Sequence, residues 1–303
     1  MVPPFVSYIT WNRMGLTVRN LSGLLETSDD FELHIVDNNS QDNTWDYLQE
    51  LRDPRIKSKT RLVSNKGPIY AVNYNLAKRK KDQYFITIDS DVYIYTKNWV
   101  TKFMEVFESF PEVGLLGLPR AKPYAGYLPP VLLNVKDGTG YLQLKNGSLR
   151  DPLDFVPGHL QCLRPELIEI IGYWSEESHT GDKEMSARVM HYTPFKVGYV
   201  TTIEIDQVQE VCCEECTAKK WCRLDIRETN CNLIREKLYY NPIFSATYFW
   251  KNNQVFKELK EGTRTAFCAS IHDEKSMEEH IYNRNWAEEN FRFFEEHANT
   301  LNN

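Results

Sequence analysis

The run YFITIDSD, residues 84–91, is the most strand-like stretch of the chain and ends in two acidic residues. Its aromatic and β-branched side chains favour an extended strand, which stops at Asp89. Two similar apolar runs precede it, at residues 5–9 and 33–36, with helical patterns between them. This alternation is typical of βαβ units. The predicted fold class is therefore α/β, with an open mixed, mainly parallel sheet flanked by helices.

Periodicity and turn residues predict further elements. Val18, Leu21 and Leu25 recur at helical spacing, which predicts a crossover helix with one apolar face. Asn43 is the expected N-cap of the next helix. The remaining predictions are a strand near residues 61–63, a hairpin at 146–147, and a last helix whose apolar spacing from Met277 to Leu301 is interrupted once, at Arg284.

The composition limits the class of protein. With 303 residues, of which 42% are hydrophobic, the chain can bury a full-sized core. The formal net charge is -6, and residues 273–303 hold eight acidic against three basic side chains, so the rest is close to neutral. Such a body lacks the basic field of a non-specific nucleic-acid binder. Sparse cysteine, no signal-like N-terminus and no apolar run of about 18 residues predict a soluble, cytoplasmic protein.

Polar clusters follow three of the predicted strands, at residues 10–13, 37–40 and 89–91. Open α/β sheets bind ligands at the carboxyl ends of their strands. There, one acidic side chain can bind a base or ribose, and an acidic pair can hold a cation beside a diphosphate. Each cluster alone is also typical of a turn, but three in register favour a nucleoside diphosphate site.

Two other phosphate-binding devices are missing from the sequence. It contains no Gly-x-Gly-x-x-Gly run and no Gly-Lys pair. The first would indicate a dinucleotide oxidoreductase and the second a P-loop nucleotidase. A metal held by acidic side chains is therefore the expected means of binding phosphate.

The runs 5–13, 35–44, 65–73 and 88–92, in this order and spacing, together resemble the nucleotide-binding half of glycosyltransferase family 2. The resemblance implies the GT-A fold and, for most of the family, inversion of the anomeric centre. It implies that Asp37 contacts the base, Asp89 the ribose region, and Asp91 an Mn²⁺ or Mg²⁺ ion that bridges the diphosphate. The further nucleotide-binding residues that it implies are Thr10, Arg13, Asn39 and Asn65.

The resemblance continues to about Val200. Residues 156–159, 164–166 and 171–174 are similar to the family's segment around the donor sugar and the acceptor, which makes His159 a candidate contact; a structural histidine is the alternative. Residues 181–188 resemble the family's Glu-Asp-x-Glu-x-Ser-x-Arg helix start, with Gly181 in place of the first Glu. Asp182 then takes the place of the catalytic base, while Glu184 is a donor or acceptor contact. Other readings are Glu184 or Glu177 as the base, and Asp182 as a helix cap.

A cysteine cluster is the second chemical signal. Cys213, Cys216, Cys222 and Cys231 are spaced so that four thiolates could bind a structural zinc ion. Ordinary thiols and a disulfide pair are the alternatives.

These observations lead to one predicted organisation. Residues 1–205 form a GT-A catalytic domain, with 1–118 binding nucleotide and metal and 119–205 binding donor sugar and acceptor; residues 206–303 form a Cys-containing helical extension. The predicted activity is a metal-dependent, inverting transfer from a nucleoside diphosphate sugar to a glycan, lipid-linked glycan, protein or modified nucleic acid. The alternatives are a catalytically degenerate nucleotide- or glycan-binding module and a nucleotide-sugar hydrolase. A zinc-dependent nucleic-acid binder is opposed by the charge balance.

Overall fold

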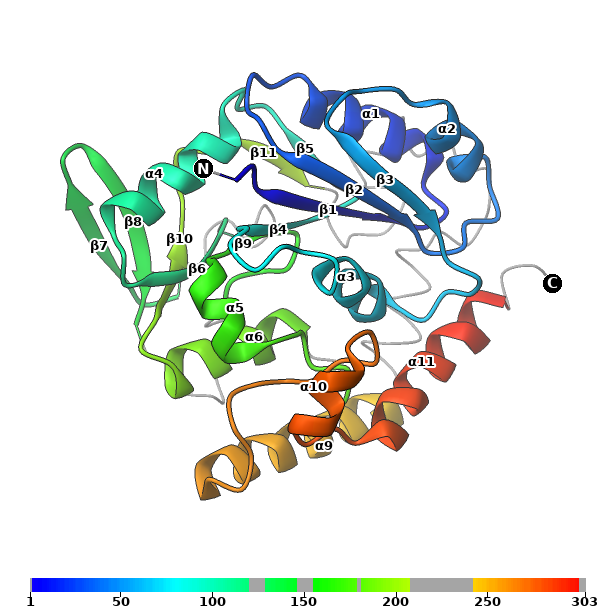
Figure 1. Cartoon of the computed structure of the whole chain (residues 1–303), viewed down its shortest axis with the longest axis vertical. Coiled ribbons are helices and arrows are strands. Elements are labelled where there is room, and N and C mark those ends of the chain that lie inside the picture. The colour runs from blue at the N-terminus through cyan, green and yellow to red at the C-terminus, as the bar shows by residue number, and fades with distance from the viewer. Residues whose placement is uncertain (1, 120–128, 146–154, 179–180, 208–241, 300–303) are drawn as a thin grey trace.

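A computed structural model describes residues 2–119, 129–145, 155–178, 181–207 and 242–299 (Figure 1). The described strands form a nine-stranded sheet in the order β3-β2-β1-β4-β9-β6-β10-β8-β7, and β5 pairs with β11 in a small second sheet. The strands are β1 (Phe5–Thr10), β2 (Glu32–Asp37), β3 (Ile56–Arg61), β4 (Phe85–Asp89), β5 (Val92–Ile94), β6 (Val113–Gly117), β7 (Val131–Lys136), β8 (Thr139–Leu144), β9 (Leu160–Leu163), β10 (Lys196–Tyr199) and β11 (Ile205–Gln207).

The large sheet is mixed and mainly parallel, as predicted. β3, β2, β1 and β4 run parallel to one another, and β10 runs parallel to β6. β9 is antiparallel to both β4 and β6, and β8 is antiparallel to both β10 and β7. Among the described strands of the large sheet, only β8 and β9 therefore run against the common direction.

Helices cover both faces of this sheet. Alternate residues of β1 point to opposite sides, so Val6 and Tyr8 join one core and Phe5 and Ile9 the other. The first core includes α1 (Met14–Leu25), α2 (Thr44–Glu50) and α4 (Trp99–Ser109); the second includes α3 (Pro68–Leu76), α5 (Pro165–Ile171) and α6 (Gly181–Tyr192).

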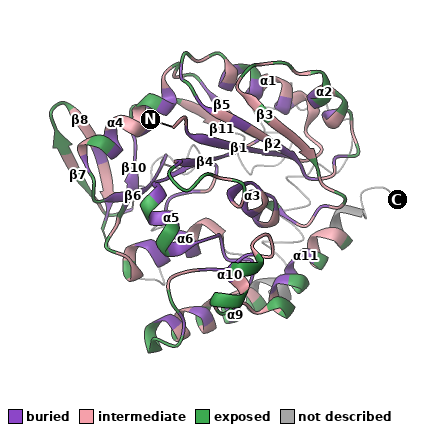
Figure 2. Ribbon diagram, viewed as in Figure 1, coloured by how far each residue is buried: buried purple, intermediate pink, exposed green. Residues whose placement is uncertain are grey.

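Three C-terminal helices lie beyond α3 and α6, on the same side of the sheet (Figure 1). They are α9 (Pro242–Glu261), α10 (Glu274–Glu279) and α11 (Arg284–Asn299). Their inward faces are buried and their outer faces exposed, as Figure 2 shows, with Val255 and Ala287 fully enclosed. Within the described ranges, no helix has both the length and the apolar character needed to cross a membrane.

The inward face of α1 differs from the predicted one. Leu16, Leu21 and Leu24 are buried, whereas Val18 and Leu25 are only partly so. The buried face of α1 includes a polar residue, Asn20, which interrupts the apolar pattern that would have identified this face from the sequence.

The N-terminus of α2 also differs in detail. Asn43 occupies the N-cap position, but its side chain makes no capping hydrogen bond. Asp42 instead accepts a hydrogen bond from the N–H of Thr44 at 3.0 Å. The carboxylate one residue earlier therefore satisfies a backbone donor of the first turn.

Two predictions about strands need correction. β3 ends at Arg61, and Val63 is 94% exposed, so it belongs to the following loop. The described hairpin joins β7 to β8 through Asp137 and Gly138, both with positive φ, as two-residue turns require. The predicted hairpin at 146–147 lies outside the described residues.

The predicted last helix is two helices. α10 ends at Glu279 and α11 begins at Arg284, and Ile281, an expected core residue, is 48% exposed. Between them, the Tyr282 hydroxyl donates to Glu176 and the Asn283 N–H donates to Glu177, both at 2.6 Å. These contacts with a distant segment of the chain hold residues 280–283 out of the helix.

We predict that Gly172→Ala destabilises the protein more than Gly262→Ala. Both glycines have positive φ, 63° and 71°, so alanine costs roughly 1–2 kcal/mol at either position. A Cβ atom at Gly172 would also lie 2.4 Å from the carbonyl oxygen of Cys268, whereas nothing lies within 4 Å at Gly262. This overlap should cost a further 1–3 kcal/mol, roughly. Equal shifts of the urea unfolding midpoint for the two variants would contradict the packing.

Candidate functional site

The three polar clusters lie side by side at one edge of the sheet. Thr10, at the end of β1, is opposite Asp37 at the end of β2. On the other side of β1, Ile9 is opposite Asp89 at the end of β4. Parallel strands end at the same edge, so this register brings the clusters together.

Hydrogen bonds between the loops that follow β1 and β2 hold this edge in shape. The Asn38 N–H donates to the Thr10 carbonyl at 2.8 Å, and the Asn12 N–H donates to Ser40 Oγ at 2.9 Å. Asn12 and Asn39 both have positive φ, which asparagine tolerates better than most residues. Asn39, predicted to bind the nucleotide, therefore also forms the turn.

Asp37 is fully buried at this edge. Both of its carboxylate oxygens are 3.2 Å from the N–H of Ser40, and Arg61 Nε lies 3.5 Å away. Burial raises the pKa of Asp37, while the hydrogen bonds from Ser40 and the charge of Arg61 oppose the rise. Its carboxylate is thus already engaged in fixing the loop.

Thr10 and Asn65 are likewise engaged within the protein. Thr10 Oγ1 is 2.7 Å from Thr17 Oγ1, and Asn65 Oδ1 accepts from the Gly67 N–H at 2.9 Å. Gly67 has φ 91°, and a Cβ atom there would lie 2.4 Å from the ring of Phe294 in α11. The loop that leads into α3 is therefore packed against the C-terminal helices.

A buried asparagine holds the Asp89–Asp91 turn. Asn20 Nδ2, on the inner face of α1, donates to the carbonyl of Ser90 at 2.7 Å. The Asp89 N–H donates to the carbonyl of His159 at 3.0 Å. Asn20 was not predicted as a site residue. A polar residue on the buried face of a helix needs a hydrogen-bond partner, so its position could have indicated such a contact.

Asp91 has one engaged and one unengaged oxygen. Its Oδ2 accepts from Arg13 Nη1 at 3.1 Å. Its Oδ1 is buried and has no hydrogen-bond partner among the described residues. A buried anionic oxygen without a partner is costly, so this atom favours a bound cation or donor at the site.

Asp89 lies between two other carboxylates. Burial and the charge of Asp91 raise the pKa of Asp89 above its usual range; Asp182 adds to the rise and Arg13 opposes it. Asp182, from α6, accepts from the Gly158 N–H, and the carbonyl of the adjacent His159 accepts from the Asp89 N–H, so Asp182 lies at the same edge of the sheet. The structure thus brings Asp89, Asp91 and Asp182 together.

Asp182 lies in the first turn of α6 and is partly exposed. Its Oδ2 accepts from the Gly158 N–H at 2.8 Å, and its Oδ1 accepts from the Lys183 N–H at 2.9 Å. His159, next to Gly158, is 3% exposed. The carboxylate is therefore oriented by backbone donors on both sides.

The prediction that Glu184 contacts donor or acceptor is corrected by its burial. The side chains of Glu184 and Arg188 are both 0% exposed and pair at 2.7 Å, because the two residues lie one helical turn apart. Glu177 is also buried and pairs with Arg264 at 2.6 Å. Of the three candidate bases, Asp182 is the one that is partly exposed and lies beside Gly158, next to the strand-end clusters.

The predicted zinc ligands Cys213, Cys216, Cys222 and Cys231 lie outside the described residues, so zinc binding stays a prediction. The two described cysteines, Cys162 and Cys268, are free and buried. A hollow of about 580 Å³ lies between α9 and α11, lined by Glu258, Arg264, Tyr282 and Trp286 among others. No residue of the strand-end clusters lines it.

The sequence matches the family model "Glycosyl transferase family 2" over residues 6–171, more than half of the chain. The chain belongs to glycosyltransferase family 2. This confirms the resemblance seen in the sequence. No curated protein sequence matches the chain.

Several solved glycosyltransferases are similar in structure. S. aureus TarS, residues 1–349, has a TM-score of 0.49 and 17% identity over 66% of this chain and 58% of its own. Mannosyltransferase PcManGT from Pyrobaculum calidifontis, solved with GDP-Man and Mn²⁺, has 0.47 and 17% over 66% and 57%. GalNAc-T7, solved with UDP, GalNAc and Mn²⁺, has 0.50 and 12% over 69% and 44%. The chain thus spans less than two thirds of each of these proteins, and the likeness concerns the fold.

The family 2 match covers only part of the site. It includes the strand-end clusters and stops at Ile171, before Asp182 in α6. The C-terminal helices lie wholly beyond it. The family match therefore does not cover Asp182, and its place beside the strand-end clusters comes from the structure of this chain.

We predict that Glu184→Gln strongly destabilises this family 2 protein. It would leave the fully buried Arg188 without its counter-charge, a loss of about 3–5 kcal/mol. Glu279→Gln is the matched control, because it breaks the Lys275–Glu279 pair, which has the same spacing but exposed side chains. Urea unfolding should show a large loss for the first variant and almost none for the second. A stable Glu184→Gln protein would contradict the buried pair.

Proposed function

We propose that this chain is a metal-dependent, inverting glycosyltransferase that moves a sugar from a nucleoside diphosphate to an acceptor. Family membership supports the reaction class. The observation that carries the proposal is Asp91 Oδ1, a buried carboxylate oxygen without a partner among the described residues, at the strand-end edge near Asp89 and Asp182. Acidic oxygens gathered at strand ends suit a cation and a diphosphate.

The residues present fit Mn²⁺ or Mg²⁺. Hard divalent cations prefer anionic oxygen ligands, and Asp91 Oδ1 is such a ligand. In the parts of the chain that the structure covers, no three His, Cys, Asp or Glu side chains gather as a metal group. Mg²⁺ is usually bound by one or two carboxylates together with substrate phosphates, so a single carboxylate such as that of Asp91 can contribute to its site. When bound, the cation stabilises the departing diphosphate.

The proposed roles of the protein side chains follow from their contacts. Arg13 holds Asp91 Oδ2 and so fixes the orientation of that carboxylate. Asp182 accepts the proton of the acceptor hydroxyl as its oxygen attacks the anomeric carbon and the bond to the diphosphate breaks. The N–H groups of Gly158 and Lys183 orient the Asp182 carboxylate for this step.

The proposal extends to the organisation of the chain. We assign nucleotide and metal binding to residues 1–118, and donor sugar and acceptor binding to 119–205. A nucleotide-sugar hydrolase or a binding module would use the same strand-end residues. Donor turnover measured with and without a panel of glycan, lipid-linked glycan, protein and nucleic-acid acceptors separates the three: acceptor-dependent turnover supports transfer, acceptor-independent turnover hydrolysis, and binding without turnover a module.

We predict that nucleotide binding requires a divalent cation and that Asp91→Asn weakens it, because the change removes an anionic ligand. Titration calorimetry with UDP, GDP, ADP and CDP, in Mn²⁺ and in excess EDTA, measures this. Asp53→Asn is the matched control, since Asp53 is also 17% exposed and paired with an arginine, Arg55. Full turnover in excess EDTA would overturn the metal assignment.

We predict that Asp182→Asn lowers turnover by about 10²-fold or more, the size of a lost general base, while nucleotide affinity stays unchanged. Asp46→Asn, which removes an acidic residue from the first turn of α2, is the control for helix effects. Turnover near that of the unmodified protein would reduce Asp182 to a helix cap. Loss of nucleotide affinity would place it in the donor pocket instead.

A further inference from the structure

One loop of the C-terminal extension contacts both flanks of the segment that carries Asp182. The loop joins α9 to α10, and both it and these helices lie beyond the family match. Its Arg264 pairs with Glu177, five residues before Asp182. Its Ala266 carbonyl accepts from Arg188, six residues after Asp182.

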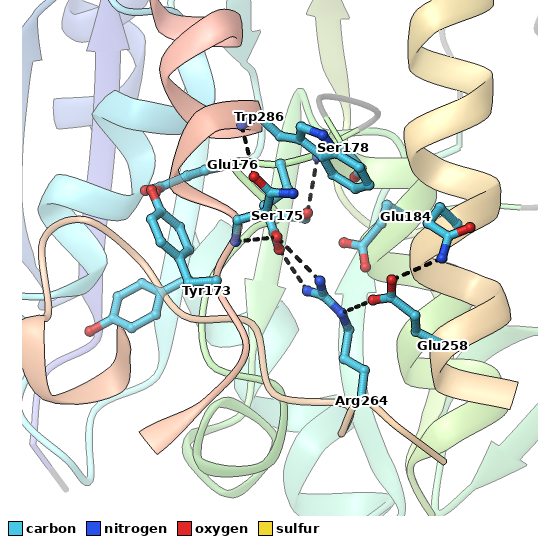
Figure 3. A network of polar contacts seen from close by, with 12 residues as sticks. Tyr173, Ser175, Glu176, Ser178, Glu184, Glu258, Arg264 and Trp286 are labelled. Atoms are coloured by element: carbon cyan, nitrogen blue, oxygen red, sulfur yellow. Dashed lines mark hydrogen bonds and ion pairs between the residues drawn. The ribbon is translucent and has the colours of Figure 1, made fainter. Parts of the chain in front are cut away.

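The upstream contact is bidentate and buried. Arg264 Nη1 and Nη2 donate to the two oxygens of Glu177 at 2.6 and 3.2 Å. Arg264 Nε donates to Glu258 of α9 at 2.9 Å, as Figure 3 shows. The Asn283 N–H adds a donor to Glu177 at 2.6 Å. The arginine thus fixes Glu177 in both distance and plane.

The adjacent Glu176 is held by the same extension. Its carboxylate accepts from the hydroxyls of Ser270 and Tyr282, each at 2.6 Å, and from Asn73 of α3 at 2.9 Å. Asn290 of α11 donates to its carbonyl at 2.6 Å. The segment before Asp182 is therefore attached to three parts of the C-terminal extension.

The downstream contact fixes α6. Arg188 is fully buried, pairs with Glu184, and donates to the carbonyl of Tyr173 at 2.8 Å and to that of Ala266 at 2.9 Å. Residues 264–266 therefore contact Glu177, before Asp182 in the sequence, and Arg188, after it.

We propose that Arg264 and Glu177 are a positioning pair for Asp182. This inference rests on the proposed function of Asp182 as the base. Asp182 has to keep its carboxylate at the Gly158 N–H, and α6, which carries it, is fixed through Arg188 to the same loop that holds Arg264. A shift of about 1 Å in a catalytic group can cost about 10²-fold in rate, so a looser flank should appear in turnover.

The test is Arg264→Lys, alone and combined with Asp182→Asn. Lysine keeps the charge that Glu177 and Glu258 need, but it cannot make the bidentate contact. We expect turnover to fall by about 10-fold in the otherwise unmodified protein, with nucleotide affinity by calorimetry unchanged. In the Asp182→Asn background the same change should have no further effect, because the positioned group is gone.

Arg79→Lys is the matched control. Arg79 is 5% exposed and pairs with Glu169 at 3.0 Å, so the substitution is equally conservative at a position outside the site. It should leave turnover unchanged in both backgrounds.

Two results would overturn the inference. Arg264→Lys with normal turnover would show that the pair is not needed, and an equal fall in both backgrounds would show a general structural effect. If Arg264→Lys does not fold, Glu177→Asp is measured in the same two backgrounds and judged by the same criteria. Failure of the proposed function is distinguished by Asp182→Asn alone, which would then turn over normally.

Discussion

Asp89, Asp91 and Asp182 lie near one another at the strand ends, and the candidate site depends on how the repulsion between their carboxylates is relieved. Arg13 pairs with Asp91, which leaves two formal negative charges if all three carboxylates are ionised. A divalent cation matches that charge, and a diphosphate then brings its own negative charge to the cation. The parallel register of β1 with β2 and β4 forms this edge of the candidate site, because it places Asp37 and Asp89 on either side of one strand end.

The C-terminal extension changes how this family 2 domain is built. It packs over α3 and α6, with Phe294 against Gly67 on the nucleotide side and Arg264 against Glu177 on the Asp182 side. The first contact reaches the loop that contains Asn65, and the second reaches Glu177, five residues before Asp182. The C-terminal extension therefore contacts both parts of the candidate site through side chains that lie outside the family match.

Local signals predicted most of the fold and the strand-end clusters. An apolar run followed by acidic residues identifies β4 and Asp89 without knowledge of any partner. Predictions failed where contacts between residues far apart in the sequence determine the local structure. Glu184 was assigned to the site through the helix-start motif, because nothing nearby in the sequence shows that its partner Arg188 is fully buried and donates to the carbonyl of Ala266. The last helix breaks at 280–283 because Glu176 and Glu177, about 100 residues earlier, accept hydrogen bonds there. Asn20 was missed because its partner, Ser90, lies on another element.

We infer that Asp91 and Asp182 face the same nucleoside diphosphate and its metal ion. A crystal of the protein grown with Mn²⁺ and a nucleoside diphosphate that binds, measured at the manganese absorption edge, tests it most directly. We expect one anomalous peak within coordination distance of Asp91 Oδ1 and of the diphosphate, with the Asp182 carboxylate lining the same pocket. A manganese peak bound elsewhere, or a diphosphate held without Asp91, would contradict it.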